Sequence, residues 1–368
     1  MQKEWYHLQR EGRHMLKWIE IDLDAVRANI RWTLSRLGTG VRLMAVVKAD
    51  GYGHGAAQVA KAAADCGAHR LGVLTVEEGR ALRQAGLKLP VHLLSPMLPE
   101  AAAEAVRWRL APTSDTLAVA RAFDAAAGAA RKGAGFPVHL DLDFGLGRWG
   151  IPPGSLRGFV SALSSMRKVR LAGLSAHIDY VAGKNAVEAE EKLAAFGRIG
   201  RALKRRFPGL VCHAANSSVL MDFPHWQFDM ARIGNLMYGI NPSVWKKAPL
   251  KDPWRFHARV IALRRVAKGS SIGYASEYVA PRRMLVATVP VGYSDGLTMV
   301  PEKRDISLGA GYQYWAMLRG RKAPFIGHTA ISHTLLDVSA TPGARVGDEA
   351  LLPVRRTAAS SHLPRVYV

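Results

Sequence analysis

The feature that most constrains the fold is an alternation of short β-rich runs with alanine-rich amphipathic stretches, which continues from residue 41 to about residue 235. This rhythm is typical of repeated strand–helix units around a parallel sheet. Helical patterns lie at 78–86, 115–131 and 187–205, for example. Eight runs predict strands, at 42–48, 70–76, 90–95, 109–113, 137–143, 169–177, 209–216 and 228–233. Because eight strands fit a closed barrel better than an open doubly wound sheet, we predict an α/β fold with a (β/α)8 TIM-type barrel.

The rhythm changes after about residue 245. Segments such as "RMLVATVPVGYSDG" and "KAPFIGHTAISHTLLDVS" predict strands joined by Gly and Pro turns, without long helices. We therefore predict two domains, a barrel over residues 1–245 and an all-β C-terminal domain over residues 246–368.

Composition bounds the class of protein. The 368 residues are 49% hydrophobic and 22% charged, as in a folded globular chain. No apolar run approaches the roughly 18 residues needed to span a bilayer, and the charged N-terminus lacks the apolar core of a signal peptide. Cys66 and Cys212 lack metal-type spacing, so we expect buried reduced thiols. These features predict a cytoplasmic protein with no membrane partner and no metal site.

The formal net charge of +22 permits attraction to nucleic acid. The basic clusters "LKRRF" (203–207), "LRRVAKG" (263–269) and "PRRM" (281–284) are far apart, however. None is interleaved with the aromatic residues that base stacking uses. We therefore expect solvated basic faces and acidic small-molecule ligands, with no nucleic-acid partner.

A lysine stands where the local pattern argues against one, in "AVVKADGYGHG" (45–55). Lys48 closes a buried strand and is followed by a glycine-spaced loop. A charged amine in this place is costly unless it is paired or used covalently. Lys48 is therefore the strongest candidate for a functional residue.

Other polar side chains fall at the ends of later predicted strands. In a barrel, the carboxyl ends of the strands carry the catalytic groups. Each of these residues also has a structural interpretation, such as a rim ion pair, a core histidine or, for Asn216 and Ser217, a helix cap. The residues are Asp141, Asp143 and Arg148 after strand five, His177 after strand six, Asn216 and Ser217 after strand seven, and Arg232 after strand eight.

Such a set suits Schiff-base chemistry. A lysine amine condenses with an aldehyde cofactor, and hydroxyls and backbone amides hold a phosphate group. Tyr52, Ser217 and the turn at Gly234 supply suitable donors, and barrels often bind phosphate on the loops after strands seven and eight.

Nine motifs occur in the order found in one known family. They are "WIEIDLDAVRANI" (18–30), "AVVKADGYGHG", "DLDFGLGRWG" (141–150), "GLSAHIDY" (173–180), "HAANSS" (213–218), "ARIGNLMYGINPS" (231–243), "IGYASEY" (272–278), "PVGYSDG" (290–296) and the final "LPRVYV". By these motifs the chain resembles the alanine racemase family, pyridoxal-phosphate enzymes with a (β/α)8 barrel and a C-terminal β domain.

The resemblance implies an isomerase of D-alanine biosynthesis that interconverts L- and D-alanine. It implies that Lys48 and Tyr274 are the two catalytic bases, with Tyr274 reaching the active site of the other subunit of a homodimer. Substrate contacts are implied for Arg148, Tyr293 and Ile331. The residues implied to bind pyridoxal 5'-phosphate are Lys48, Tyr52, Arg148, His177, Asn216, Ser217, Arg232, Gly234 and Asn235.

Racemisation needs one acid/base group on each face of Cα. Lys48 and Tyr274 have reference pKa values of about 10.4 and 10, so each must lose its proton against roughly three units at neutral pH. We expect nearby cations to lower that cost, with Arg232 and His177 acting on the tyrosine. Because arginine keeps its proton, Arg232 should leave the cofactor's ring nitrogen unprotonated, which disfavours transamination.

Several positions depart from the family pattern. Asp141 stands where many relatives carry a modified lysine that orients the arginine, and its carboxylate is expected to serve Arg148. Ile331 and Ser332 replace pocket residues, and Ser361 replaces a tyrosine. Loss of a phenol enlarges the pocket, so a racemase of a larger or more polar amino acid, of the serine or lysine/ornithine type, is an alternative.

Three further alternatives stay open from the residues alone. One is a pyridoxal-phosphate amino-acid decarboxylase on the same two-domain plan. Another is a metal-dependent hydrolase that uses His139, Asp141, His177 and His213. The third is a non-catalytic cofactor carrier or basic binding protein.

Overall fold

A computed structural model describes residues 15–130, 135–276, 278–299 and 315–368. The chain divides into two compact units. One, the barrel unit, is Leu23–Asp252; the other, the β unit, joins the segment up to Asp22 with Pro253–Val368.

The barrel unit contains the predicted parallel strands. They form two hydrogen-bonded runs, β10-β2-β3-β4-β5 and β6-β7-β8-β9. Their bounds are β2 (Arg42–Val46), β3 (Arg70–Val73), β4 (Val91–Leu93), β5 (Leu110–Ala111), β6 (Thr113–Ser114), β7 (Phe136–Leu142), β8 (Val169–Ala176), β9 (Val211–His213) and β10 (Met230–Ile233).

The two runs close into one eight-stranded barrel. β5 and β6 are the halves of a single strand, interrupted at Pro112, which has no N–H to donate to a neighbour. On the other side, the Asp229 N–H donates to the Cys212 carbonyl (3.0 Å) and the Arg232 N–H to the Ala215 carbonyl (2.8 Å), which links β9 to β10. The predicted (β/α)8 barrel is confirmed.

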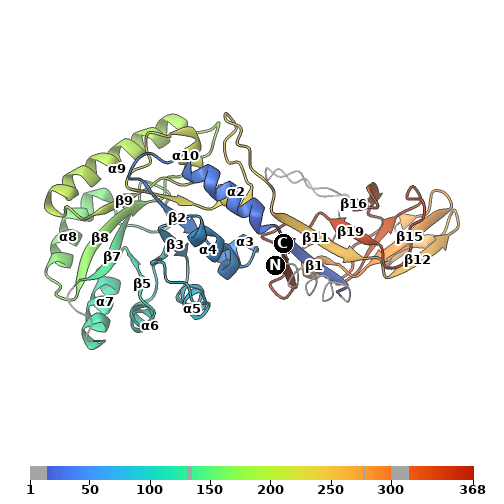
Figure 1. The fold of residues 1–368 in the computed structure, drawn as a ribbon, viewed down its shortest axis with the longest axis horizontal. Coiled ribbons are helices and arrows are strands. Elements are labelled where there is room, and N and C mark those ends of the chain that lie inside the picture. The colour runs from blue at the N-terminus through green and yellow to red at the C-terminus, as the bar shows by residue number, and fades with distance from the viewer. Residues whose placement is uncertain (1–14, 131–134, 277, 300–314) are drawn as a thin grey trace. The chain divides into compact units, whose positions relative to one another are not determined.

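Helices surround the strands of the barrel unit (Figure 1). Outward-facing strand residues such as Leu43 and Ala45 pack with helix residues in one large apolar core. Met44 belongs instead to a small separate cluster with Val211 and Met230 inside the barrel, as the alternation of side chains along a strand requires. The helices are α2 (Leu23–Leu34), α3 (Lys48–Tyr52), α4 (Ala56–Asp65), α5 (Val76–Gln84), α6 (Ala102–Arg107), α7 (Leu117–Ala129), α8 (Leu156–Ser164), α9 (Ala186–Arg206) and α10 (Ser217–Asp222).

In the described part of the β unit, the strands form three antiparallel or mixed sheets. Their strand orders are β17-β16-β19-β11-β1-β20, β12-β15-β18 and β13-β14. The bounds are β1 (Lys17–Ile21), β11 (Trp254–Arg259), β12 (Ala262–Val266), β13 (Ser271–Ile272), β14 (Tyr278–Val279), β15 (Met284–Val289), β16 (Trp315–Leu318), β17 (Arg321–Pro324), β18 (Thr334–Asp337), β19 (Glu349–Leu352) and β20 (Arg365–Tyr367).

The N-terminal strand belongs to the β unit, which differs from the predicted division at residues 245 and 246. β1 pairs antiparallel with β11, with Ile19 opposite Phe256, and parallel with β20. This pairing buries Ile19 and Ile21 completely. The partners of β1 are more than 200 residues away in the sequence, so local patterns carry no sign of the pairing.

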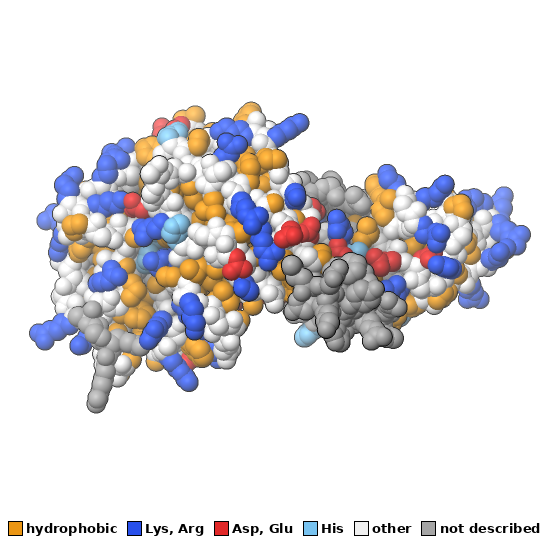
Figure 2. Space-filling model, viewed as in Figure 1, with side chains coloured by type: hydrophobic (Ala, Val, Ile, Leu, Met, Phe, Trp, Pro, Cys, Tyr) orange, Lys and Arg blue, Asp and Glu red, His pale blue; other side chains and the backbone are white. Residues whose placement is uncertain are grey.

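Lysine and arginine side chains are dispersed over the visible face of each unit (Figure 2). They do not gather there into a single basic stripe. Among the described residues, no helix combines the length and the apolar character needed to cross a membrane.

Candidate active site

A cavity of about 730 Å³ opens among residues that follow the carboxyl ends of the barrel strands. Its lining includes all nine residues that the sequence singled out for one ligand: Lys48, Tyr52, Arg148, His177, Asn216, Ser217, Arg232, Gly234 and Asn235. Their individual roles remain predictions, but the fold places them around one space.

Lys48 is followed by a turn of left-handed backbone. The φ angles of Ala49, Asp50 and Tyr52 are 51°, 51° and 55°, and Gly51 between them has 62°. This conformation costs about 1–2 kcal/mol for each residue with a side chain. Specific contacts must therefore hold the turn.

Two carboxylates provide those contacts. The Asp50 side chain accepts a hydrogen bond from the Ala56 N–H at 2.8 Å. Glu78 accepts from the Ala49 N–H at 2.6 Å with one oxygen and from the Leu74 N–H at 2.8 Å with the other. Glu78 also completes the capping box that begins α5. It thus ties the residue after Lys48 to the start of a helix.

Replacing Glu78 by glutamine should weaken this turn. One acceptor oxygen becomes a donor, so either the Ala49 or the Leu74 N–H loses its partner, at a cost of about 1–2 kcal/mol. We expect a lower melting temperature and altered reactivity of the Lys48 amine towards an amine-selective reagent, followed by mass spectrometry.

The matched control is Glu77→Gln, which removes the same charge one residue earlier, at the same helix end, from an exposed side chain. Equal behaviour of the two variants would show that Glu78 acts only as a helix cap and does not hold the turn after Lys48.

The Lys48 amine is tuned by its surroundings. Burial lowers its pKa, and the positive charges of Arg148 and Arg232 lower it further, whereas Glu78 opposes the shift. A larger share of the side chain is therefore the neutral, nucleophilic amine at neutral pH than in an exposed lysine.

Several groups that line the cavity can donate hydrogen bonds. The Ser217 hydroxyl is buried and, among the described residues, has no hydrogen-bond partner. A side chain at Gly234 would collide with the Tyr52 hydroxyl, since its Cβ would lie 2.5 Å from that oxygen. Burial raises the pKa of Tyr52, so the phenol stays protonated and can donate a hydrogen bond. The arrangement suits an anionic group.

Asn216 serves the helix as well as the cavity. Its side-chain oxygen accepts a hydrogen bond from the Val219 N–H at 3.0 Å and so caps α10. That oxygen is engaged, which favours the structural interpretation of the Asn216 side chain.

Two arginines also line the cavity and make it cationic. Arg232 is buried and donates to the Ala176 carbonyl at 2.8 Å and to the carbonyl and Nδ1 of His213. Burial lowers its pKa to about 10, so it stays charged at neutral pH. The Arg148 guanidinium stacks on Trp149, 3.6 Å from the ring centre.

Asp141 contacts Ser175 and not Arg148. Its carboxylate accepts a hydrogen bond of 2.5 Å from the Ser175 hydroxyl, the single side-chain bond to Asp141 among the described residues. Burial raises the pKa of Asp141, while Ser175, Arg232 and Arg148 act to lower it. Asp141 therefore acts on Arg148 through the interaction of their charges, and not through a hydrogen bond.

The charge of His177 differs from the expectation, which was a cation near the catalytic tyrosine. Burial lowers its pKa to about 3, helped by Arg232, Arg148 and Lys48. Because three positive groups surround it, the imidazole is neutral at physiological pH. It can position a partner by hydrogen bonding but cannot lower a tyrosine pKa by positive charge.

Tyr274, Tyr293 and Ile331 lie in the β unit. Tyr274 is 67% exposed and precedes two residues of positive φ, Ala275 and Ser276. Tyr293 and Ile331 come from adjacent loops, joined by a hydrogen bond of 3.1 Å from the Tyr293 N–H to the Ala330 carbonyl. Gly292 is required there, since a Cβ would overlap the carbonyls of Ala330 and Ile331.

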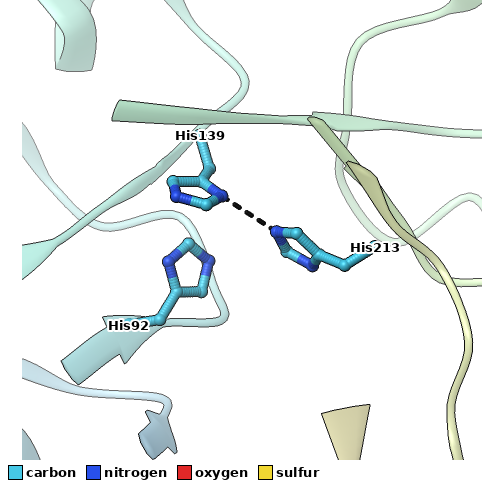
Figure 3. A group of neighbouring side chains, drawn as sticks. All are labelled: His92, His139 and His213. Carbon is cyan, nitrogen blue, oxygen red and sulfur yellow. Dashed lines mark hydrogen bonds between the residues drawn. The ribbon is translucent and has the colours of Figure 1, made fainter. Parts of the chain in front are cut away.

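A buried cluster of three histidines lies inside the barrel (Figure 3). His92, His139 and His213 each expose 1% or less. The sequence had grouped His139 and His213 with Asp141 and His177 in the hydrolase alternative. His92 was missed; the available signal was a polar residue between the outward-facing Val91 and Leu93.

Acid should destabilise the fold through this cluster. Burial and four arginines lower the pKa of His139 to about 3, whereas an unfolded histidine titrates near 6.5. The unfolded chain therefore binds more protons between these values, so stability is complete above pH 6.5 and declines as the pH falls towards 3. At pH 5, this one histidine should lower the free energy of unfolding by about 2 kcal/mol relative to neutral pH.

Urea unfolding at pH 7 and pH 5 measures this effect, and His139→Asn should flatten the pH dependence. His225→Asn is the control, because His225 is an exposed histidine paired with Glu190. An equal flattening by both variants would contradict the assignment to His139.

Comparison with known proteins places the chain in a family. The model of the alanine racemase N-terminal domain matches residues 21–242, and that of the alanine racemase C-terminal domain matches residues 254–362. The alanine racemase of Halothermothrix orenii is 33% identical over 338 residues, which cover 91% of this chain and 86% of that protein. The alanine racemase of Symbiobacterium thermophilum is 36% identical over 347 residues, with coverage of 91% and 86%.

Solved structures agree. The alanine racemase from D-cycloserine-producing Streptomyces lavendulae superposes with a TM-score of 0.84 at 28% identity, over 96% of this chain and 97% of that chain. The alanine racemase from Streptomyces coelicolor A3(2) superposes with a TM-score of 0.83 at 29% identity, over 97% of this chain and 99% of that chain. Two family models that together span most of the chain, relatives above 30% identity and a shared two-domain fold lead to one conclusion: the chain belongs to the alanine racemase family.

Proposed function

We propose that the protein is a pyridoxal-phosphate-dependent racemase that interconverts L- and D-alanine. The observation that carries the proposal is the Lys48 amine, which has a lowered pKa in a cavity also lined by Ser217, whose buried hydroxyl has no hydrogen-bond partner among the described residues. The relatives named alanine racemase support the same activity.

The cavity fits pyridoxal phosphate by its donors. Lys48 offers the amine that condenses with the aldehyde, and Ser217, Tyr52 and the backbone at Gly234 and Asn235 would hold the phosphate. Arg232 would face the ring nitrogen. When bound, this cofactor withdraws the electron pair left at Cα when the substrate loses its proton.

The residues of this chain then supply proton transfer. Lys48 takes or returns the Cα proton on one face, and Tyr274 does so on the other. Arg232 cannot give up a proton and donates every hydrogen bond it makes, so a ring nitrogen facing it stays unprotonated. Neutral His177 would orient Tyr274 through a hydrogen bond, in place of the cationic role expected from the sequence.

The proposal includes a homodimer with shared active sites, in which Tyr274 of one subunit completes the cavity of the other. The exposure of Tyr274, 67% in the single chain, supports this arrangement. A cytoplasmic location also belongs to the proposal. The two cysteines, Cys66 and Cys212, are unpaired, as in reducing compartments.

The test is incubation of the cofactor-loaded protein with L-alanine in deuterium oxide. We expect D-alanine with one deuterium at Cα. L-serine, L-lysine and L-ornithine, run in parallel, test whether the enzyme prefers a larger or more polar substrate. Ile331 and Ser332, which replace pocket residues of the family, are the reason for this alternative. Release of carbon dioxide without a D-amino acid would favour a decarboxylase, and no exchange with any substrate would refute a racemase.

A further inference from the structure

The histidine cluster of Figure 3 has one hydrogen-bonding arrangement that its neighbours permit. Arg232 Nη1 donates to His213 Nδ1 at 2.9 Å. Because a guanidinium has no acceptor, Nδ1 of His213 must be without a proton. Burial and Arg232 keep the pKa of His213 well below its usual value, so the ring is neutral and its proton lies on Nε2.

That proton needs an acceptor, and His139 provides it. His213 Nε2 lies 2.9 Å from His139 Nδ1, and the two rings share this bond in the barrel interior. His139 must then hold its own proton on Nε2. The order of donors and acceptors therefore runs from Arg232 through His213 to His139 without a free choice at either ring.

Packing fixes both rings in place. His139 is opposite Gly173 on β8, and any side chain at Gly173 would overlap the His139 ring. The His92 ring lies 4.4 Å from that of His139 and 5.4 Å from that of His213, at steep angles to both. His92 Nε2 is itself 3.1 Å from the Thr113 hydroxyl. The cluster thus has little room to rotate.

A metal ion is the competing interpretation, since one nitrogen from each ring lies within 4.8 Å of the others. Two facts argue against it. The His139 Nδ1 and His213 Nε2 atoms already share a hydrogen bond. The charges of Arg70 and Arg232 act on all three rings, and no carboxylate belongs to the group, so a dication would meet uncompensated repulsion.

We propose that His139, wedged by His92, is a positioning residue for racemisation: it accepts the His213 proton and so keeps His213 turned to accept from Arg232. The inference rests on the proposed function, because Arg232 is expected to face the cofactor's ring nitrogen. A displaced Arg232 would let that nitrogen gain a proton from water, which makes the ring a stronger electron sink and favours transamination.

Two variants of His139 separate positioning from packing. Asparagine places its Oδ1 near the site of the histidine Nδ1 and keeps the acceptor, whereas leucine fills the space without one. In the cofactor-loaded enzyme, we expect His139→Leu to lower kcat about tenfold or more, with little change in KM. It should also raise the pyruvate released per racemisation and shift the pH dependence of the cofactor's absorbance.

His139→Asn should restore all three values to within about threefold of the parent enzyme. His225→Leu changes an exposed histidine that lies outside the cluster, and it should leave the three values unchanged. Normal kinetics and pyruvate release in a folded His139→Leu protein would overturn the proposal, as would equal defects in the leucine and asparagine variants.

Nitrogen-15 NMR of histidine-labelled protein without cofactor tests the geometry even if the leucine variant does not fold. We expect neutral rings with the proton on Nε2 for both His213 and His139. A proton on Nδ1 of either ring would refute the proposal, and so would tight binding of one zinc ion that His139→Leu abolishes. If the tautomers are as expected but the parent protein does not racemise alanine, the proposed function fails and the network stands.

Discussion

Replacing Lys48 by alanine should abolish both racemisation and retention of the cofactor on dialysis. The variant loses the amine that holds the aldehyde and the base on one face of Cα, so we expect a fall in kcat of at least about 10⁴-fold. Compared with the parent protein without cofactor, the folded variant should melt at the same temperature or higher, because the change removes a cation that Arg148 and Arg232 repel. Racemisation rate, visible absorbance after dialysis and melting temperature measure the three effects.

Lys61→Ala is the matched control, since Lys61 lies exposed on α4 in a pair with Asp65. Borohydride reduction of the parent protein followed by peptide mapping should place the pyridoxyl group on Lys48. Cofactor attached to another lysine, or retained colour in Lys48→Ala, would refute the central assignment.

Replacing Tyr274 by phenylalanine should slow racemisation by about 10²–10⁴-fold while the cofactor stays bound. Because L- and D-alanine have equal free energies, kcat/KM must fall equally in both directions. The asymmetry appears in proton exchange: deuterium from solvent should still enter Cα of the enantiomer whose proton faces Lys48, and not of the other.

Tyr278→Phe removes a hydroxyl four residues along the same segment and serves as the control. Mixing Tyr274→Phe with Lys48→Ala subunits tests the shared site, because a heterodimer would contain one intact pair of bases. Equal exchange of both enantiomers in Tyr274→Phe would show that another residue is the second base, and no recovery on mixing would argue against sites shared between subunits.

Regular elements were predictable because their patterns are local. The strand expected at 169–177 is Val169–Ala176, and the helix expected at 187–205 is Ala186–Arg206. The strand expected at 109–113 divides at Pro112, a break that proline chemistry explains. The alternation of β-rich and helical runs, with eight predicted strands, sufficed for the barrel.

The cavity was also partly predictable. Parallel strands of a barrel bring their carboxyl ends to one rim, so the sequence predicts that residues such as Lys48, His177 and Arg232 lie together. What the sequence could not show is how each is held. The left-handed turn after Lys48 depends on Glu78, a residue of the next strand–helix unit.

The sequence by itself determined the order of strands and helices, the rim on which the polar residues meet and the family, because these follow from local periodicity and from motifs in fixed order. Only the tertiary structure decided that β1 joins the β unit, that His177 is neutral and that His92 joins His139 and His213. Strand pairing, burial and the sum of neighbouring charges depend on residues far apart in the chain, and no local pattern records them.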